Sequence, residues 1–295
     1  MDFGRQGTLE PRLRLLRFLT PIEKDRQLDQ SPEIPNNAGR RVSFVRLARD
    51  SVFELILTSV LLFGVVSIVR WVIGPSPTSR TVPGIHAELW IVGAAVALLL
   101  AGLILSPLGR ASGGHTNPAI SLAMWRFRVF PGAGVIPYAI AQLLGSVLGV
   151  VAAHGVWGDV AAKPPVVYAA LQPGPGWSTW ELFATEAFGM AVIVLIVGLC
   201  LAVQRLTPFV PWIVAALVGI GIAVLGTATG GSLNPARQFG PAVVSGQTQF
   251  LGVYLVAPLL GAVVAAWLRS LLQYRRKVLT HRLCGTVGLP AGNQI

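Results

Sequence analysis

The sequence predicts an all-α membrane protein with six transmembrane helices and two half-length helices, arranged as an inverted repeat. Three observations lead to this fold class. Hydrophobic residues make up 53% of the 295-residue chain and charged residues only 12%, about half the charged fraction of a typical soluble domain. Six apolar segments are each long enough to cross a bilayer. One tripeptide, Asn-Pro-Ala, occurs twice between them.

The six predicted spans follow from the length of the apolar segments. A helix that crosses a bilayer needs about 20 mostly apolar residues, and turns rich in Gly and Pro separate the candidate segments. The spans are expected at 50–73, 87–108, 132–156, 179–203, 209–229 and 250–272.

The spans and the basic residues divide the chain into three parts. A channel domain is expected at 50–272, with repeat halves 50–157 and 178–272. A basic, disordered arm at 1–49 and a basic tail at 273–295 flank it.

The distribution of basic residues predicts the orientation in the membrane. Ten of the 23 Lys and Arg residues lie before residue 50, and five lie from Arg269 onward. Because cytoplasmic segments carry an excess of Lys and Arg, both termini are expected in the cytoplasm of a multi-pass plasma (cytoplasmic) membrane protein. We therefore attribute the net charge of +11 to topology and expect the lipid bilayer, and no nucleic acid, as a partner.

The two Asn-Pro-Ala tripeptides predict half-length helices. They stand at Asn117-Pro118-Ala119, between the second and third spans, and at Asn234-Pro235-Ala236, between the fifth and sixth. Asn is a favoured N-cap residue, and Pro suits the first helical turn. The apolar segment after each motif is too short to cross a membrane. Since each half has three spans, the two halves must have opposite orientations.

Two half-helices that enter from opposite faces would meet with their N-termini near the middle of the bilayer. Each N-terminus carries roughly half a positive charge, and paired half-helix dipoles repel protons and cations from a water-filled pore. The side-chain amides of Asn117 and Asn234 would offer donors to a passing oxygen atom. The pattern therefore predicts a pore for uncharged molecules.

On these motifs the chain resembles the aquaporin, or major intrinsic protein, family. The stretches 112–119 and 234–242 are similar to its paired signatures, and 138–145 and 258–262 are similar to its third and sixth helices. The resemblance covers about residues 50–272. It implies the aquaporin-like right-handed bundle of six transmembrane helices with two re-entrant half-helices, and homotetramers. It also implies passage of water and small neutral solutes without a cofactor or metal.

Three ionisable residues near the motifs have two interpretations each. Glu54 and Glu186 sit early in the first span of each half, and an ionisable group in a span is usually functional or paired. They could carry protons, or they could accept hydrogen bonds from the half-helix loops; the matching positions favour the second role. His115 could present a hydrogen-bonding edge to the pore or hold its loop together.

The resemblance assigns the narrowest ring of the pore to Ala97, Ile222, Gly231 and Arg237. Val96 and Ala223 are alternatives for the two positions that depend on helix register. Arg237 offers five donors in a fixed fork and repels cations. A ring of Ala, Ile, Gly and Arg has no aromatic side chain and resembles that of nodulin-like members, which pass boric and arsenous acid. Such a ring should also admit glycerol and urea.

Three other kinds of membrane protein are alternatives to a solute channel. An ordinary water-selective aquaporin is the main alternative, because Ala242 and Tyr254 resemble water channels whereas Leu255 resembles glycerol channels. An ion-coupled secondary transporter can also contain inverted repeats, but it would depend on an ion. A membrane enzyme would need clustered catalytic groups. The spans contain no close cluster of His, Cys, Asp and Glu, so the sequence indicates no enzyme.

Overall fold

The computed structural model describes residues 44–82, 84–272 and 277–285, and all regular structure in these ranges is helical. Six helices are long and apolar enough to cross a membrane. They are α1 (Phe44–Val72), α3 (Gly84–Leu105), α6 (Gly132–Trp157), α8 (Thr179–Cys200), α9 (Val210–Leu225) and α11 (Leu251–Leu272). The half-length helices are α5 (Pro118–Arg126) and α10 (Pro235–Ser245). The predicted fold class is therefore confirmed.

Five short helical turns connect these elements. They are α2 (Pro77–Thr81), α4 (Pro107–Ser112), α7 (Asp159–Ala162), η3 (Val167–Ala169) and η4 (Thr207–Phe209). The last of these leads directly into α9.

The first helix begins earlier than expected. It starts at Phe44, so residues 44–49, assigned to the N-terminal arm, are helical. The predicted boundary at residue 50 was the point where the apolar run begins. A helix can extend beyond that point, because charged residues can continue the helix outside the hydrocarbon layer. Here Arg49 pairs with Asp50 at 2.8 Å and lies 5.6 Å from the ring centre of Phe53. The remainder of the predicted arm, residues 1–43, lies outside the described residues.

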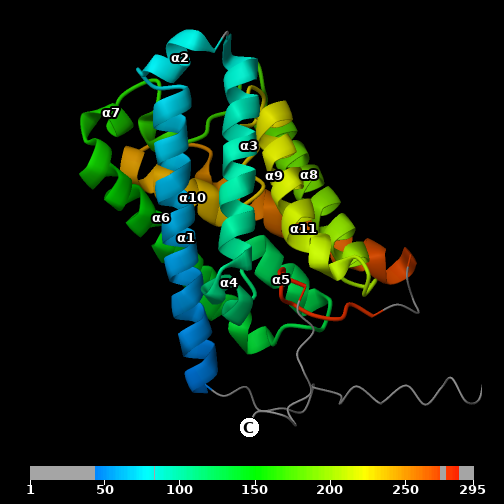
Figure 1. Ribbon diagram of the computed structural model, residues 1–295. Helices are drawn as coiled ribbons and strands as arrows, with labels where there is room; N and C mark the ends of the chain where they lie inside the picture. Colours follow the sequence, from blue (N-terminus) through cyan, green and yellow to red (C-terminus); the bar gives the residue numbers. More distant parts are fainter. Residues whose placement is uncertain (1–43, 83, 273–276, 286–295) are drawn as a thin grey trace, which may run out of the picture. The chain divides into compact units, whose positions relative to one another are not determined.

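The packing of the helices repeats between the two halves. Helix α1 packs along α6 in the first half, and α8 packs along α11 in the second. The halves join through α3 against α9, and each half-helix contacts the other half's bundle, α5 beside α11 and α10 beside α6. Figure 1 shows the half-helices inside the bundle rather than at its edge. This interlocking places both Asn-Pro-Ala motifs at its centre.

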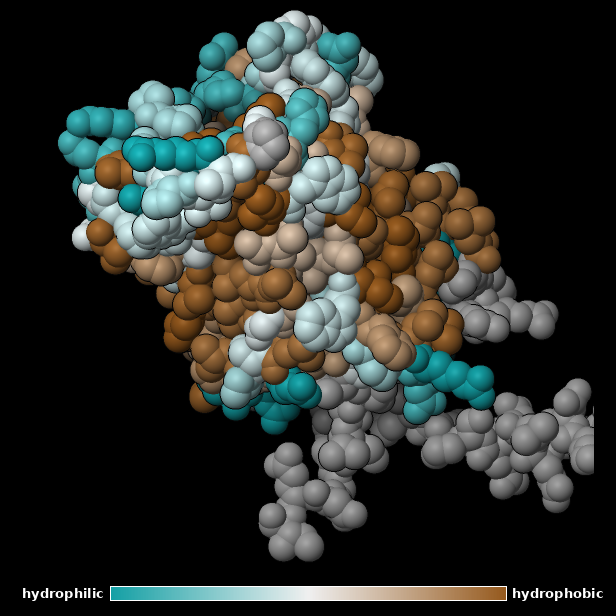
Figure 2. Space-filling model, turned by 45° about the horizontal axis from the view of Figure 1, so that its top comes forward, coloured by the Kyte–Doolittle hydropathy of each residue, from teal (hydrophilic) through white to brown (hydrophobic). Residues whose placement is uncertain are grey.

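The outer surface of the spans is apolar. Large side chains such as Leu98, Ile136 and Phe188 are more than two thirds exposed on the helices. On the face drawn in Figure 2, apolar residues cover the middle and hydrophilic residues gather toward the two ends. A helix that is apolar on all sides is typical of a membrane span, and the protein is a multi-pass membrane protein.

Glycines let the paired helices approach closely at equivalent places. A side-chain carbon at Gly145 of α6 would collide with the carbonyl oxygen of Leu55 on α1, and one at Gly261 of α11 with that of Ala187 on α8. Small residues at such crossings allow the backbones to make van der Waals contact. Gly149 of α6 lies against the Ser59 carbonyl of α1 in the same way, so the close pairing of α1 with α6 and of α8 with α11 depends on these glycines.

Candidate pore and its half-helix loops

Both half-helices begin as the sequence predicts. Asn117 and Asn234 are the N-caps of α5 and α10, with extended backbones, and a Pro follows each in the first turn. The side-chain oxygen of Asn117 accepts from the Ala119 amide at 2.8 Å, and that of Asn234 accepts from the Ala236 amide at 2.9 Å. The amide oxygens are thereby occupied, which orients the amide nitrogens away from their own helices.

Those amide nitrogens connect the two motifs to each other. Nδ2 of Asn117 donates to the carbonyl oxygen of Leu233 at 3.0 Å, and Nδ2 of Asn234 donates to that of Thr116, also at 3.0 Å. We call this exchange the asparagine clamp. It fixes the two helix N-termini face to face, and each amide nitrogen keeps a second hydrogen for another acceptor.

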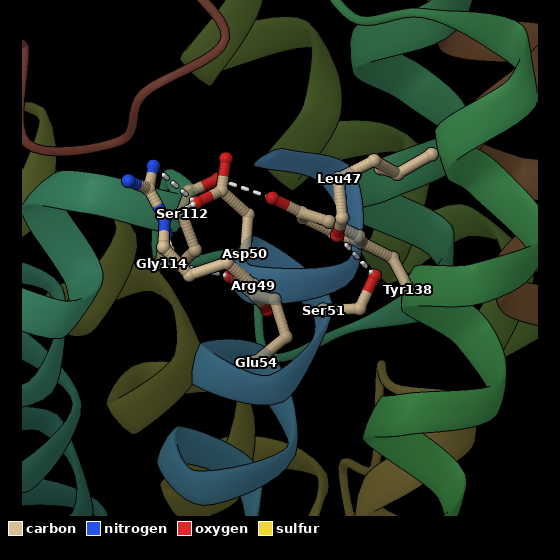
Figure 3. Close-up of polar contacts among 8 residues, drawn as sticks. All are labelled: Leu47, Arg49, Asp50, Ser51, Glu54, Ser112, Gly114 and Tyr138. Atoms are coloured by element: carbon tan, nitrogen blue, oxygen red, sulfur yellow. Dashed lines mark hydrogen bonds and ion pairs between the residues drawn. The ribbon is translucent and has the colours of Figure 1, made fainter. Parts of the chain in front are cut away.

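Glu54 anchors the loop that leads into the first half-helix. Its carboxylate accepts from Ser112 Oγ at 2.7 Å, from the backbone amides of His115 and Thr116 at 3.0 and 2.7 Å, and from Gln142 Nε2 at 2.8 Å. Figure 3 shows Glu54, Ser112 and Tyr138 meeting from three separate segments, and Tyr138 Oη donates to the Ser112 carbonyl at 2.8 Å.

Glu186 does the same for the second half-helix. It accepts from Thr229 Oγ1 at 2.7 Å and from the amides of Ser232 and Leu233 at 3.1 and 2.7 Å. Tyr254 Oη donates to the Thr229 carbonyl at 2.6 Å, the counterpart of Tyr138. Both carboxylates are fully buried. Backbone amides inside a membrane need partners, and these carboxylates supply them.

The loops themselves have matching left-handed turns. Gly113 and Gly114 have φ of 110° and 65°, and Gly230 and Gly231 have φ of 83° and 60°. Thr116 and Leu233, which directly precede the two asparagines, also have positive φ, 46° and 50°. Such backbones are uncommon outside glycine, so the carboxylate contacts hold a conformation that the chain would otherwise rarely adopt.

A cavity runs past both motifs. Its wall contains residues of four spans (Leu61, Val65, Val96, Leu100, Met190, Ile193, Val214, Val218, Ile222), of both half-helix regions (His115, Thr116, Asn117, Ile120, Gly231, Ser232, Leu233, Asn234, Arg237) and of the tail (Leu283). Apolar side chains form most of the wall, and the polar groups gather at the loops. Of the four expected ring residues, Ile222, Gly231 and Arg237 lie on this wall.

One of the four expected ring residues does not lie on the cavity wall. Val96 lines the cavity, whereas Ala97 is not part of its wall. A Cβ atom at Gly219 of α9 would lie 3.1 Å from the Cβ of Ala97, so Ala97 faces the contact between α3 and α9. The prediction counted residues back from the Asn-Pro-Ala motif through α3 to Ala97. In the structure, the rotation of α3 against α9 turns the preceding residue, Val96, toward the cavity instead.

Arg237 is held by the loop between α7 and α8, a contact that the sequence did not reveal. Its Nη1 donates to the carbonyl of Ala169 at 2.7 Å. Ala169 belongs to η3, where three successive residues have positive φ. Gln238 fixes the same loop, since its amide oxygen accepts from the Leu171 amide at 3.0 Å and its nitrogen donates to the Leu171 carbonyl at 2.9 Å. The remaining guanidinium donors are left for the cavity.

His115 contacts both the loop and the pore. Its ring lies on the cavity wall, with Nδ1 3.0 Å from Ser121 Oγ and Nε2 3.0 Å from the carbonyl oxygen of His281. A carbonyl only accepts, so Nε2 carries the proton of the neutral ring and Nδ1 accepts from Ser121. Both ring nitrogens have partners inside the protein, so the ring holds its loop in place and, in this structure, presents no free nitrogen to the cavity.

A cavity lined by two opposed half-helices inside a six-span bundle defines a membrane channel. The chain belongs to the major intrinsic protein family, whose sequence pattern it matches over residues 41–269. It is accordingly a channel for water and small solutes and not an enzyme.

Individual relatives agree with this assignment. The chain is 37% identical to the probable aquaporin AqpM of Archaeoglobus fulgidus over 63% of this chain and 77% of the relative. It is 29% identical to the probable aquaporin NIP7-1 of Arabidopsis thaliana over 78% and 77%, respectively. It is also 30% identical to the glycerol uptake facilitator protein of Haemophilus influenzae over 61% and 77%.

A solved structure shares the fold. The aquaglyceroporin of Plasmodium falciparum superimposes with a TM-score of 0.61 at 23% identity, over 75% of this chain and 94% of that one.

Proposed function

We propose that this channel passes small uncharged solutes, such as boric acid, arsenous acid, glycerol and urea, together with water, and excludes protons and ions. The observation that carries the proposal is the character of the ring. Among the described residues that line the cavity there is no Phe, Tyr or Trp. Val96, Ile222 and Gly231 provide an apolar side, and Arg237 provides one strong donor.

This chemistry suits a compact solute with hydroxyl or amide groups. The Arg237 guanidinium, held by Ala169, can bind one oxygen atom while the apolar side contacts the rest of the molecule. Beyond it, the amide hydrogens of Asn117 and Asn234 that the clamp leaves unused offer the next donors. Relatives named as a glycerol uptake facilitator and as nodulin-26, each 30% identical, support a solute channel.

Exclusion of cations follows from the charges along the cavity. Two helix N-termini face it at the asparagine clamp, and Arg237 adds a full positive charge. None of the described wall residues is acidic, because Glu54 and Glu186 are directed at the loop amides instead. An ion-coupled transporter would need an acceptor group in the pathway, so this arrangement favours a passive channel.

A water-selective aquaporin is the second candidate, since several relatives are named aquaporins. We further propose that the protein forms homotetramers in the plasma membrane with both termini in the cytoplasm. The excess of basic residues at the chain ends supports this orientation.

The test measures solute and water flow separately. Liposomes with the full chain are swollen in boric acid, glycerol or urea gradients and shrunk in sucrose, and Val96→Phe is compared with Leu98→Phe. The second variant adds the same ring on the same helix at a side chain 68% exposed. We expect Val96→Phe alone to abolish solute entry while water flow persists.

Two other results would be decisive against the proposal. Parent protein that conducts water without any of the solutes is an ordinary aquaporin. Equal rates of solute entry in the parent and in Val96→Phe would show that Val96 is not part of the ring. Gly231 is unsuited to such a test because it has φ of 60° and a side-chain carbon there would lie 2.5 Å from the Gly221 carbonyl oxygen.

A further inference from the structure

Part of the C-terminal tail folds against one end of the pore. Residues 277–285, which we call the closing segment, run without helix or strand beside the first half-helix loop and are drawn in red near α5 in Figure 1. The sequence predicts only a basic tail at 273–295. Instead, four of its nine residues are buried: Val278, Thr280, Leu283 and Cys284.

Backbone contacts join the closing segment to separate sides of the pore. The amide of Leu279 donates to the Leu201 carbonyl just after α8, and the amide of Leu283 donates to the Gly113 carbonyl in the first loop, both at 3.0 Å. Between them, the His281 carbonyl accepts from His115 Nε2.

The last described residue of the segment continues this course. A side-chain carbon at Gly285 would collide with the Thr207 carbonyl between α8 and α9. The segment therefore extends across this end of the cavity, from α8 past the first loop to η4.

Leu283 enters the pore itself. Its side chain is 1% exposed and forms part of the cavity wall together with His115 and Asn117. Beside it, the His281 ring packs against His115 and Phe130, with ring centres 5.7 and 5.4 Å apart. An apolar side chain at this place removes the hydrogen-bonding partners that a file of water requires.

We propose that the closing segment is a built-in plug, which shuts the pore at the His115 end when docked and opens it when released. The proposal concerns water flow and is independent of which solutes the ring admits.

The contacts of the segment are suited to reversible docking. The Leu201 and Gly113 carbonyls and His115 Nε2 lie at the pore end, where water can replace the segment as their partner. Only four residues separate Lys277 from Leu272, the end of α11. Such a short tether gives the segment a high effective concentration at the pore, so weak contacts suffice for closure.

The test compares variants of the full chain that disrupt docking in different ways. Leu283→Asn places an amide in the apolar pocket, and Gly285→Val collides with the Thr207 carbonyl. Lys277→Asn, at an exposed position of the same segment, is the matched control. Water permeability is measured in liposomes under a sucrose gradient. Docking is measured separately, by the rate at which a thiol reagent labels Cys284, 6% exposed when docked, in a Cys200→Ala background.

Release of the plug should raise both quantities. If the open form is populated to ten per cent or less, as is usual for a minor state, full release raises water permeability about tenfold or more. We expect this for Leu283→Asn and Gly285→Val, with faster labelling of Cys284, and no change for Lys277→Asn. Faster labelling without greater water flow would overturn the proposal. So would unchanged labelling in both variants, because the segment would then not be held by the contacts described.

Discussion

At the scale of single residues, the same side chain takes different roles according to the groups around it. Glu186 of α8 is fully buried and accepts from Thr229, Ser232 and Leu233. Glu181, five residues earlier on the same helix, is exposed and caps the helix start through Ser178. The buried carboxylate determines a loop conformation, whereas the exposed one only stabilises a helix end. Position in the fold, not residue type, separates the two.

His281 gives the closing segment a pH dependence. Burial, together with the nearby His115 and Arg282, lowers the pKa of its ring from 6.5 to about 3. The docked segment therefore holds the neutral ring. Docking is fully stable above pH 6.5 and weakens as the pH falls below that value toward 3, because the released ring binds a proton that the docked ring does not.

We predict that acidification releases the segment. Between pH 7.5 and pH 5.5 the docking equilibrium should fall by about tenfold. The measurement is the labelling rate of Cys284 at each pH, divided by the rate in Leu283→Asn to remove the pH dependence of the thiol. His281→Gln should flatten the profile. A ratio that stays constant in the parent protein would show that protonation of His281 does not control docking.

At the scale of elements, close helix packing depends on a few glycines whose neighbours are carbonyl groups. Gly261 and Gly252 lie on the same helix, α11, but only Gly261 has another backbone against it, that of Ala187 on α8. No heavy atom lies within 4 Å of a side-chain carbon at Gly252. The two positions therefore form a natural pair for testing whether the crossing of α8 and α11 stabilises the bundle.

Gly261→Ala should destabilise the protein by about 1–3 kcal/mol, because the added methyl group forces α8 and α11 apart. Gly252→Ala should be neutral or slightly stabilising, since Ala is the better helix former. Thermal unfolding of both variants in detergent measures the difference. Similar melting temperatures for the two would contradict the close contact at Ala187.

At the scale of the whole molecule, the pore exists only because two halves interlock. Neither half-helix loop is complete alone: each asparagine donates to a carbonyl of the other half, and each half-helix packs on a helix of the other half. The N-termini of α5 and α10 thus meet in one place, and both helices contribute to the positive potential there.

Asn234→Asp should therefore make the pore leak cations or protons. Aspartate can still accept from the Ala236 amide, but it cannot donate to the Thr116 carbonyl, and it places a negative charge where the positive ends of two helix dipoles meet. Proton entry into liposomes loaded with a pH-sensitive dye measures the leak. Asn234→Ser, which breaks the clamp without adding charge, is the control. An equal leak in both variants would assign exclusion to geometry rather than to charge.

Much of this architecture is determined by the sequence itself. The composition and the six apolar segments indicate membrane spans. These spans must be helical, because backbone polar groups in lipid need hydrogen-bond partners within the same segment. The two Asn-Pro-Ala motifs locate α5 and α10, since an N-cap and a first-turn Pro are local requirements. Because three spans, an odd number, separate the two motifs, the two halves must have opposite orientations. The matching positions of Glu54 and Glu186 likewise indicate a shared role.

Tertiary packing decided which side of a helix faces the pore and which residues far apart in the sequence touch each other. Whether Val96 or Ala97 faces the pore is set by how α3 turns against Gly219, and no local pattern records that rotation. Ala169 reaches Arg237 through a loop 68 residues away in sequence, and Leu283 reaches the cavity wall from the tail. Neither the loop around Ala169 nor the tail around Leu283 has a sequence motif that would predict these contacts. The sequence therefore determines that there is a pore, and the folded structure determines which side chains line it, from Val96 on α3 to Leu283 of the tail.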